Sequence, residues 1–173
     1  MAVAAAGCGN TPTRRRADAD AADGSDTDDC SGMFESIVWA TDGSDLADGA
    51  LEHVLELARA NHSKIVAVHA NELLVGRYGG APLSADEPEM REKIAQQVEE
   101  LRAAGFEAEL EIRSGSHDVA TLIARAADDV NAGLIVVGTH GHGGLAAALM
   151  GSVARGLCHH ANQPVLVVPP AAR

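Results

Sequence analysis

The chain has 173 residues, a length that fits one domain with a sizeable core. Its formal net charge of −12 argues against nucleic acid or an anionic membrane as a partner, and no apolar run approaches the roughly 20 residues of a membrane span. Hydrophobic residues make up 46% of the chain but aromatic ones only 2%, so the core must consist of Val, Leu, Ile and Ala. Three cysteines without metal-ligand spacing (Cys8, Cys30 and Cys158) indicate a reducing compartment.

Residues 1–32 differ in composition from the rest of the chain. They contain three consecutive arginines (14–16) and six aspartates, but no Leu, Ile, Phe, Trp or Tyr. Such a segment buries too little apolar surface to offset the entropy lost on ordering. We therefore predict a disordered tail over 1–32 and one folded domain over 33–170, with Met33 as a second candidate for the start of translation.

From residue 33 onwards, short apolar runs alternate with segments of helical spacing. A loop of about 17 residues, rich in Gly and Pro, follows the second run, and the helix after this loop should end at a Gly105 cap. Ser116 is predicted to cap the third helix. Strands are expected at 36–41, 64–70, 107–113, 134–137 and 164–168, with a helix after each of the first four.

This alternation predicts an α/β fold, in which a single doubly wound domain has a parallel sheet with helices on both faces. Runs 36–41 and 134–137 are apolar throughout and should lie centrally, whereas run 107–113 alternates and should form an edge. The last run is apolar too. For a final strand this indicates an edge covered by a second copy, hence a dimer, or by the chain's own C-terminal residues.

A glycine-rich segment follows the run that ends at Val137. Gly138 and Gly141 come first, and Gly151-Ser152 follows after nine intervening residues. Glycine lets a backbone approach an anion closely, and the first N–H groups of a helix lack partners of their own. We therefore predict a phosphate site here, with a flexible connector and serine cap as the alternative.

The P-loop pattern is absent, because no lysine follows Gly151. Charge neutralisation would then come from backbone dipoles, magnesium, and His142 or Arg155. His140 and His142 share the loop, but no third ligand at useful spacing supports a zinc site. His69 is expected to be a hydrogen-bonded strand residue.

In a doubly wound sheet, ligands bind beyond the carboxyl ends of the strands, where the strand order reverses. The first and fourth runs are the best candidates to flank that point, so Asp42 should face the Gly138–Gly141 segment across a crevice. A carboxylate there suits a ribose hydroxyl or a magnesium ion. The alternative is that Asp42 or Ser44 simply caps the following helix.

From about Met33 to Pro169, the chain resembles the universal stress protein family. The resemblance rests on Ile37-Val-Trp-Ala-Thr-Asp42-Gly-Ser-Asp45, Val68-His69, Gly138-Thr-His-Gly141 with Gly151-Ser152-Val153, and Pro164-Val-Leu-Val-Val168. The glycine spacing is the family's ATP-binding signature. The resemblance implies a Rossmann-like five-stranded parallel sheet of order 3-2-1-4-5 with four helices. It also implies a cytoplasmic protein that dimerises through the last strand, Val165 to Val168.

The resemblance further implies a site for ATP with Mg²⁺. Backbone at Ala70 would pair with adenine, and the phosphates would lie at the glycine segment. The implied nucleotide-binding residues are Ala40, Thr41, Asp42, Ala70, Val137, Gly138, Gly141, His142, Gly151, Ser152 and Val153.

The leading hypothesis is a nucleotide-dependent regulator in the stress response. We expect slow ATP hydrolysis or none, because the sequence offers no clear water-activating base and no arginine finger in position. Two alternatives remain: a slow ATPase or nucleotidyl-transfer enzyme on the same fold, and a module that binds cyclic AMP or another adenylate.

Overall fold

The computed structural model describes residues 33–76, 79–82, 87–141 and 150–170. The tail predicted over 1–32 lies outside the described residues, as does His142. None of the helices within those described ranges is long and apolar enough to cross a membrane.

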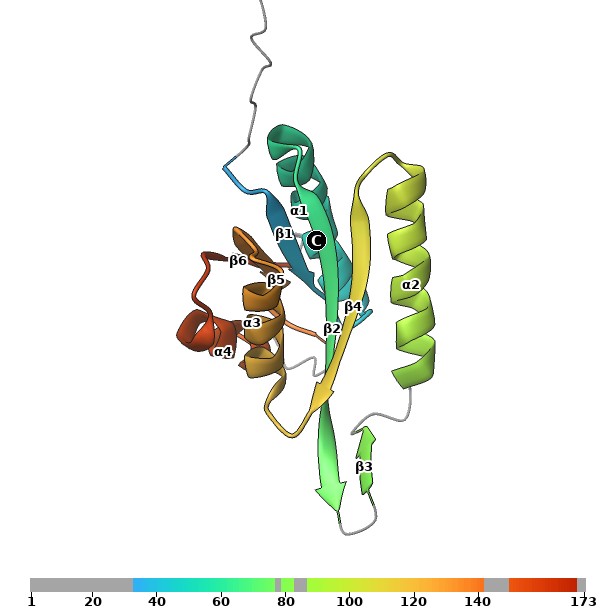
Figure 1. The fold of residues 1–173 in the computed structure, drawn as a ribbon, viewed down its shortest axis with the longest axis vertical. Helices are drawn as coiled ribbons and strands as arrows, with labels where there is room; N and C mark the ends of the chain where they lie inside the picture. The colour runs from blue at the N-terminus through green and yellow to red at the C-terminus, as the bar shows by residue number, and fades with distance from the viewer. Residues whose placement is uncertain (1–32, 77–78, 83–86, 142–149, 171–173) are drawn as a thin grey trace, which may run out of the picture.

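Strands and helices alternate along the chain as the pattern predicted, except that the second strand is followed directly by a third (Figure 1). They are β1 (Ser36–Ala40), α1 (Asp45–Asn61), β2 (Lys64–Gly76), β3 (Gly79–Pro82), α2 (Glu87–Ala103), β4 (Ala108–Gly115), α3 (Val119–Asp129), β5 (Leu134–Gly138), α4 (Ser152–His160) and β6 (Val165–Val168).

Five of the strands form one parallel sheet in the order β4-β2-β1-β5-β6. Counted among the parallel strands alone, this is the order 3-2-1-4-5, so the predicted fold is confirmed. β1 and β5 lie centrally, and β4 pairs with β2 at one edge, both as expected. The order reverses between β1 and β5, which places the ends of these two strands at the predicted crevice.

The prediction of a loop after Ala70 was wrong in part. β2 continues to Gly76 and pairs antiparallel with β3, from Leu73 opposite Pro82 to Gly76 opposite Gly79. In Figure 1 this hairpin projects beyond the ends of the helices. Gly and Pro are tolerated in β3 because it is an edge strand, where a missing N–H breaks no ladder.

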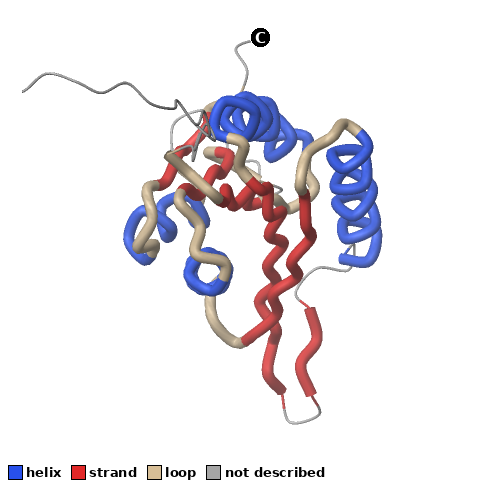
Figure 2. The backbone as a smooth tube through the Cα atoms, turned by 45° about the horizontal axis from the view of Figure 1, so that its top comes forward, coloured by secondary structure: helices blue, strands red, loops and turns tan. Residues whose placement is uncertain are grey.

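Helices lie on both faces of the sheet (Figure 2), and one hydrophobic cluster fills the space on each face. Side chains on a strand point alternately to opposite faces. Val38 therefore packs on the cluster with α3 and α4, whereas Ile37 and Trp39 pack on the cluster with α1 and α2. The single tryptophan, Trp39, is fully buried at the centre of the sheet and belongs to the core.

The ends of the helices carry one confirmed and one corrected prediction. Gly105 has a φ of +90° just after α2, as its expected capping role requires. The cap of α3 is Asp118 rather than Ser116, because the Asp118 carboxylate accepts a hydrogen bond from the N–H of Thr121 (3.1 Å). The chain leaving β4 reaches helical geometry two residues later than expected.

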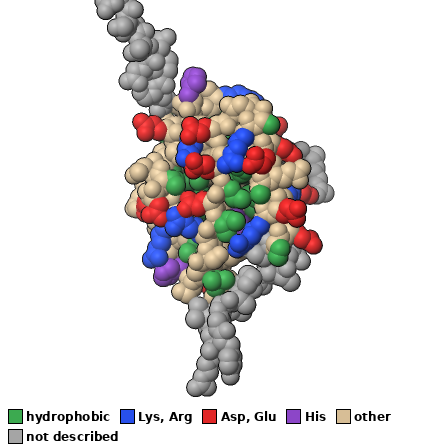
Figure 3. Space-filling model, turned by 45° about the vertical axis from the view of Figure 1, so that its right-hand side comes forward, with side chains coloured by type: hydrophobic (Ala, Val, Ile, Leu, Met, Phe, Trp, Pro, Cys, Tyr) green, Lys and Arg blue, Asp and Glu red, His purple; other side chains and the backbone are tan. Residues whose placement is uncertain are grey.

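The edge strand β4 carries charged side chains that pair with their neighbours. Arg113 contacts Glu111 and lies 2.8 Å from Asp129, and Glu109 lies 2.8 Å from Lys64 of β2. Charges on an edge strand oppose pairing with another chain. Figure 3 shows acidic and basic side chains interspersed over one face of the molecule.

Candidate functional site

The turn between β1 and α1 is held by a short chain of hydrogen bonds. The hydroxyl of Thr41 accepts from the N–H of Gly43 (3.1 Å), and Asp42 Oδ1 accepts from the N–H (3.0 Å) and the hydroxyl (2.6 Å) of Ser44. The Ser44 hydroxyl in turn accepts from the N–H of Ala47 (3.2 Å) and caps α1. The cap is therefore Ser44, and Asp42 orients it.

Gly43 lies at the sharpest point of this turn. Its φ is +74°, a conformation that costs an L-residue with a Cβ roughly 1 kcal/mol. The strand-to-helix turn thus depends on glycine at 43 as well as on the side chains around it.

The main-chain groups of Ala70 point toward the side of β2 on which β1 lies, just beyond the end of that strand. The N–H of Thr41 donates to the carbonyl of Val68 (3.1 Å), so the polar groups of Val68 point toward β1. Main-chain groups of successive strand residues alternate in direction, so those of Ala70 point the same way. β1 itself ends at Ala40. A main-chain donor and acceptor aimed beyond a strand end suit the edge of a planar heterocycle.

His69 lies beside this position and fixes the end of β1. It is 2% exposed, and its Nδ1 lies 3.1 Å from the carbonyl oxygen of Thr41. A carbonyl only accepts hydrogen bonds, so Nδ1 carries the proton. The prediction of a hydrogen-bonded strand histidine is confirmed.

The end of β5 lies beside the β1–α1 turn. Val137 and Gly138 are buried, and a Cβ at Gly138 would lie 3.3 Å from the carbonyl oxygens of Leu46 and His140. This packs the end of β5 against the first turn of α1, so the two turns predicted to face each other do so.

Gly141 lies directly against the side chain of Asp42. A Cβ at Gly141 would lie 3.1 Å from Asp42 Cγ and closer still to Oδ2. The predicted apposition of the first-strand carboxylate and the glycine segment is thereby present in the structure. A side chain at position 141 would therefore force the Asp42 carboxylate to move.

The N-terminus of α4 forms the third part of the site. The N–H of Gly151 donates to the carbonyl of Thr139 (2.8 Å), which ties α4 to the end of β5. The main-chain N–H of Gly151 is therefore used to hold α4 against the end of β5. The N–H groups of Ser152 and Val153 belong to the first turn, where a helix provides no internal acceptor, and the side chain of Ser152 is exposed.

One buried polar atom beside these turns has no partner among the described residues. It is Nε2 of His140, whose Nδ1 lies 3.2 Å from the hydroxyl of Thr139. Buried polar atoms are ordinarily satisfied by protein, water or ligand. The described residues contain no group of three or more His, Cys, Asp and Glu side chains that could hold a metal ion. A cation would therefore need most of its ligands from phosphate oxygens and water.

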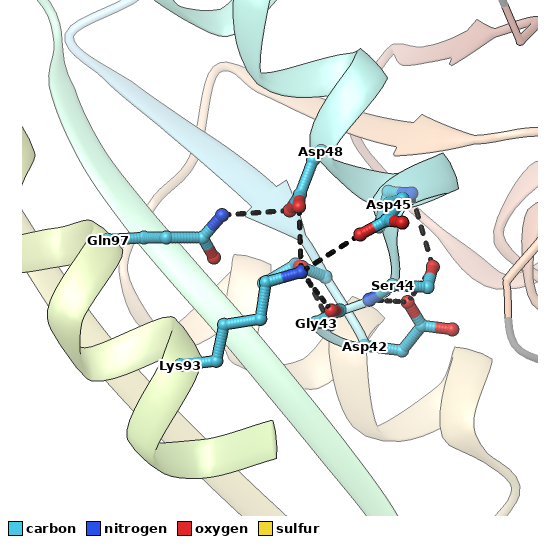
Figure 4. A network of polar contacts seen from close by, with 9 residues as sticks. Asp42, Gly43, Ser44, Asp45, Asp48, Lys93 and Gln97 are labelled. Carbon is cyan, nitrogen blue, oxygen red and sulfur yellow. Dashed lines mark hydrogen bonds and ion pairs between the residues drawn. The ribbon is translucent and has the colours of Figure 1, made fainter. Parts of the chain in front are cut away.

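Sequence reasoning missed Lys93 of α2. Its Nζ donates to the carbonyl of Gly43 (2.7 Å) and to Asp48 Oδ2 (2.9 Å), as Figure 4 shows. The hydrogen bond with Asp48 is the main cause that raises the pKa of Lys93 above its ordinary value. Lys93 and Gly43 are 50 positions apart, so no local pattern could have predicted the contact.

The chain is similar throughout its described domain to proteins of one family. The model of the universal stress protein family matches residues 33–169. A universal stress protein of Methanocaldococcus jannaschii is 31% identical over 147 residues, which cover 79% of this chain and 82% of the relative.

Two solved structures extend the comparison. The universal stress protein from Archaeoglobus fulgidus in complex with dAMP has a TM-score of 0.59 at 28% identity, over 78% of this chain and 98% of that chain. A universal stress protein in complex with cAMP has a TM-score of 0.53 at 26% identity, over 78% of this chain and 96% of that one.

Proposed function

Because the chain belongs to the universal stress protein family, we propose that it binds ATP with Mg²⁺ and regulates a stress response. The nucleotide lies between the β1–α1 turn, Ala70 of β2 and the glycine segment after β5. The protein works in the cytoplasm, in keeping with the resemblance and with the lack of a cysteine framework.

The observation that carries this proposal is the apposition of Asp42 and Gly141. It brings a carboxylate from one strand end against a glycine backbone from another, at the point where the strand order reverses. The carboxylate suits the ribose hydroxyls, and the main chain of Ala70 suits adenine. Both groups lie at the same end of the sheet.

The phosphate part of the proposal is supported by three features. The N–H groups of Ser152 and Val153 are donors in the first turn of α4, a helix of nine residues. Gly138 and Gly141 let the two turns pack closely without side chains between them, and His140 Nε2 is a buried atom that has no partner among the described residues. His142, also proposed as a phosphate contact, lies outside the described residues.

Mg²⁺ fits this site as a companion of the nucleotide. Magnesium is commonly held by one or two carboxylates together with phosphates and water. Asp42 would be the carboxylate for the ion only where it does not hold the ribose, and in either case the ion would neutralise phosphate charge that no P-loop lysine meets. The described residues suggest no base for activating water, so hydrolysis is slow or absent.

The proposal is tested first by denaturing the purified full chain and searching the supernatant for adenine nucleotides by mass spectrometry. Titration calorimetry with ATP, AMP and adenosine, each with Mg²⁺, then measures the contribution of the phosphates. We expect ATP to bind most tightly. Absence of binding by all three ligands contradicts the proposal.

The phosphate contact has its own variant, Ser152→Ala. The exposed hydroxyl can be removed without loss of packing, and a hydrogen bond to a charged phosphate is worth about tenfold in affinity. Affinity for ATP should fall by about that factor while affinity for adenosine stays unchanged, so adenosine is the internal control. An equal loss for both ligands argues against a phosphate contact at this serine.

A second candidate function is binding of a monophosphate, either cyclic AMP or another adenylate. It is favoured by the two similar proteins whose structures contain dAMP and cAMP. Competition of both monophosphates against a fluorescent ATP analogue separates the candidates. Displacement at lower concentrations of cyclic AMP than of ATP would make the adenylate module the better description.

A further inference from the structure

Lys93 joins helix α2 to the turn that carries Asp42. Besides the carbonyl of Gly43, its Nζ lies 2.9 Å from Asp48 Oδ2 and 3.4 Å from Asp45 Oδ1. One turn further along α2, the amide of Gln97 donates to Asp48 Oδ1 (2.8 Å). Figure 4 shows Lys93 and Gln97 reaching from α2 toward the first turn of α1.

This is an unusual place for a cation. The N-terminus of a helix carries partial positive charge, so a lysine there is unfavourable on its own. Asp45 and Asp48 in the first turn of α1 offset the charge. The hydrogen bond from Lys93 to the carbonyl of Gly43 is a separate contact. Gly43 precedes α1, so this bond does not offset any charge of the helix.

The Gly43 carbonyl belongs to the same peptide unit as the N–H of Ser44. Lys93 Nζ donates to the oxygen of this peptide unit (2.7 Å), and the N–H of the same unit, that of Ser44, donates to Asp42 Oδ1 (3.0 Å). A peptide unit is planar and rigid, so both hydrogen bonds depend on one orientation. Consecutive hydrogen bonds also polarise one another, which strengthens the bond to the carboxylate.

We propose that Lys93 is a positioning residue of the nucleotide site, which holds the Gly43–Ser44 peptide in the orientation that directs the Asp42 carboxylate to the nucleotide. This rests on the proposed function. It assigns a role in the site to α2, a helix that contributes none of the signature residues.

The first test is nucleotide affinity of the full chain carrying Lys93→Met. We expect ATP affinity to fall by about tenfold, the effect of one charge-assisted hydrogen bond. Lys93→Arg, which keeps the charge and the donors, should recover part of the loss. Lys64→Met is the matched control, because it removes the same charge from a partly exposed pair with Glu109. Equal affinities of Lys93→Met and Lys64→Met would overturn the proposal.

The second test asks whether Lys93 acts through Asp42. In the Asp42→Ala background, Lys93→Met should change ATP affinity by less than about twofold, because the group being positioned is gone. The same tenfold loss in both backgrounds would assign Lys93 a role in general stability instead.

A third measurement separates failure of this inference from failure of the proposed function. Hydrogen exchange of the Ser44 amide, followed by NMR in nucleotide-free protein, reports the Gly43–Ser44 peptide directly. Exchange should be about tenfold faster in Lys93→Met than in Lys64→Met, since one anchor of the peptide is lost. If the wild type binds no adenine nucleotide but exchange still rises, the positioning contact stands and the proposed function falls. Unchanged exchange refutes the contact itself.

Discussion

The carboxylate of Asp42 lies against the α-carbon of Gly141, so closely that a side chain at 141 would collide with it. The φ of Gly141 is outside the left-handed region that favours glycine. The requirement for glycine at this position is therefore steric, and it is set by Asp42. Gly141 thus lets the two turns of the site pack against each other.

The first prediction concerns this steric pair. Gly141→Ala should lower the free energy of unfolding by about 1–3 kcal/mol, the usual cost of inserting a methyl group into a filled space. In the Asp42→Ala background the same change should cost less than about 0.5 kcal/mol, because the colliding carboxylate is gone. Urea unfolding of the four proteins measures this cycle. An equal cost in both backgrounds would show that Asp42 is not what excludes the methyl group.

The second prediction concerns Gly43, which has space for a methyl group but the wrong backbone angle. Its nearest neighbours lie 3.6 Å from a built Cβ, while its φ is +74°. Gly43→Ala should therefore destabilise the fold by about 1 kcal/mol through backbone strain. It should also weaken ATP binding, since the turn presents Asp42.

Gly49 is the matched control for this substitution. It lies inside α1, and nothing lies within 4 Å of its built Cβ. Gly49→Ala should stabilise the protein by about 0.5–1 kcal/mol, because alanine favours a helix interior. Thermal unfolding should thus move in opposite directions for the two variants. A Gly43→Ala protein that is as stable as the wild type would contradict the strain argument.

The strand order and the crevice could be predicted because both follow from pattern and topology. Buried parallel strands are unbroken apolar runs, as in Ile37–Trp39, and parallel strands bring their carboxyl ends to one side. Asp42 and Gly141 each follow a central run, so their apposition needed no knowledge of side-chain contacts. The same reasoning identified 107–113 as an edge strand, because its alternating polar and apolar residues indicate that one face is exposed to solvent.

What the sequence did not predict depends on competition between neighbours or on distant contacts. Ser116 and Asp118 are both good caps, and only the path of the chain from β4 to α3 selects Asp118. Gly79 and Pro82 have loop composition, yet they pair because the end of β2 offers a partner. Lys93 is an ordinary helix lysine until α2 docks beside Gly43.

The third prediction concerns the cap at Asp118 and its pH dependence. Hydrogen bonds from the hydroxyl and then the N–H of Thr121 lower the pKa of Asp118 from its ordinary value of 3.8. A lowered pKa in the folded state means that the carboxylate stabilises the fold above the unfolded-state pKa, and that this stabilisation is lost as pH falls through the folded value.

Asp118→Ala should therefore cost about 1 kcal/mol at pH 7, as expected for loss of a helix cap. The difference from wild type should shrink as the pH falls below 3.8, where the wild-type carboxyl becomes protonated. Urea unfolding at several pH values measures it. Asp118→Asn, which still caps, should show a smaller loss at pH 7. A difference that is constant across pH would remove the carboxylate from the explanation.

The last prediction concerns the proposed dimer through the final strand, Val165 to Val168. β6 pairs with β5 on one side, and Leu166 is a large hydrophobic side chain that remains 37% exposed. We propose that a second copy covers this edge, because an exposed apolar edge strand readily pairs with another chain. Leu166→Glu introduces a charge there and should dissociate the dimer.

Ile112→Glu is the matched control, since Ile112 is 38% exposed on β4, the opposite edge of the parallel sheet. Sedimentation equilibrium of the full chain should show a dimer for the wild type and for Ile112→Glu, and a monomer for Leu166→Glu at the same concentration. A charge buried in an interface costs several kcal/mol, enough to weaken association by more than about tenfold. Dissociation by Ile112→Glu instead would move the interface to β4. A monomeric wild type would refute the proposed dimer.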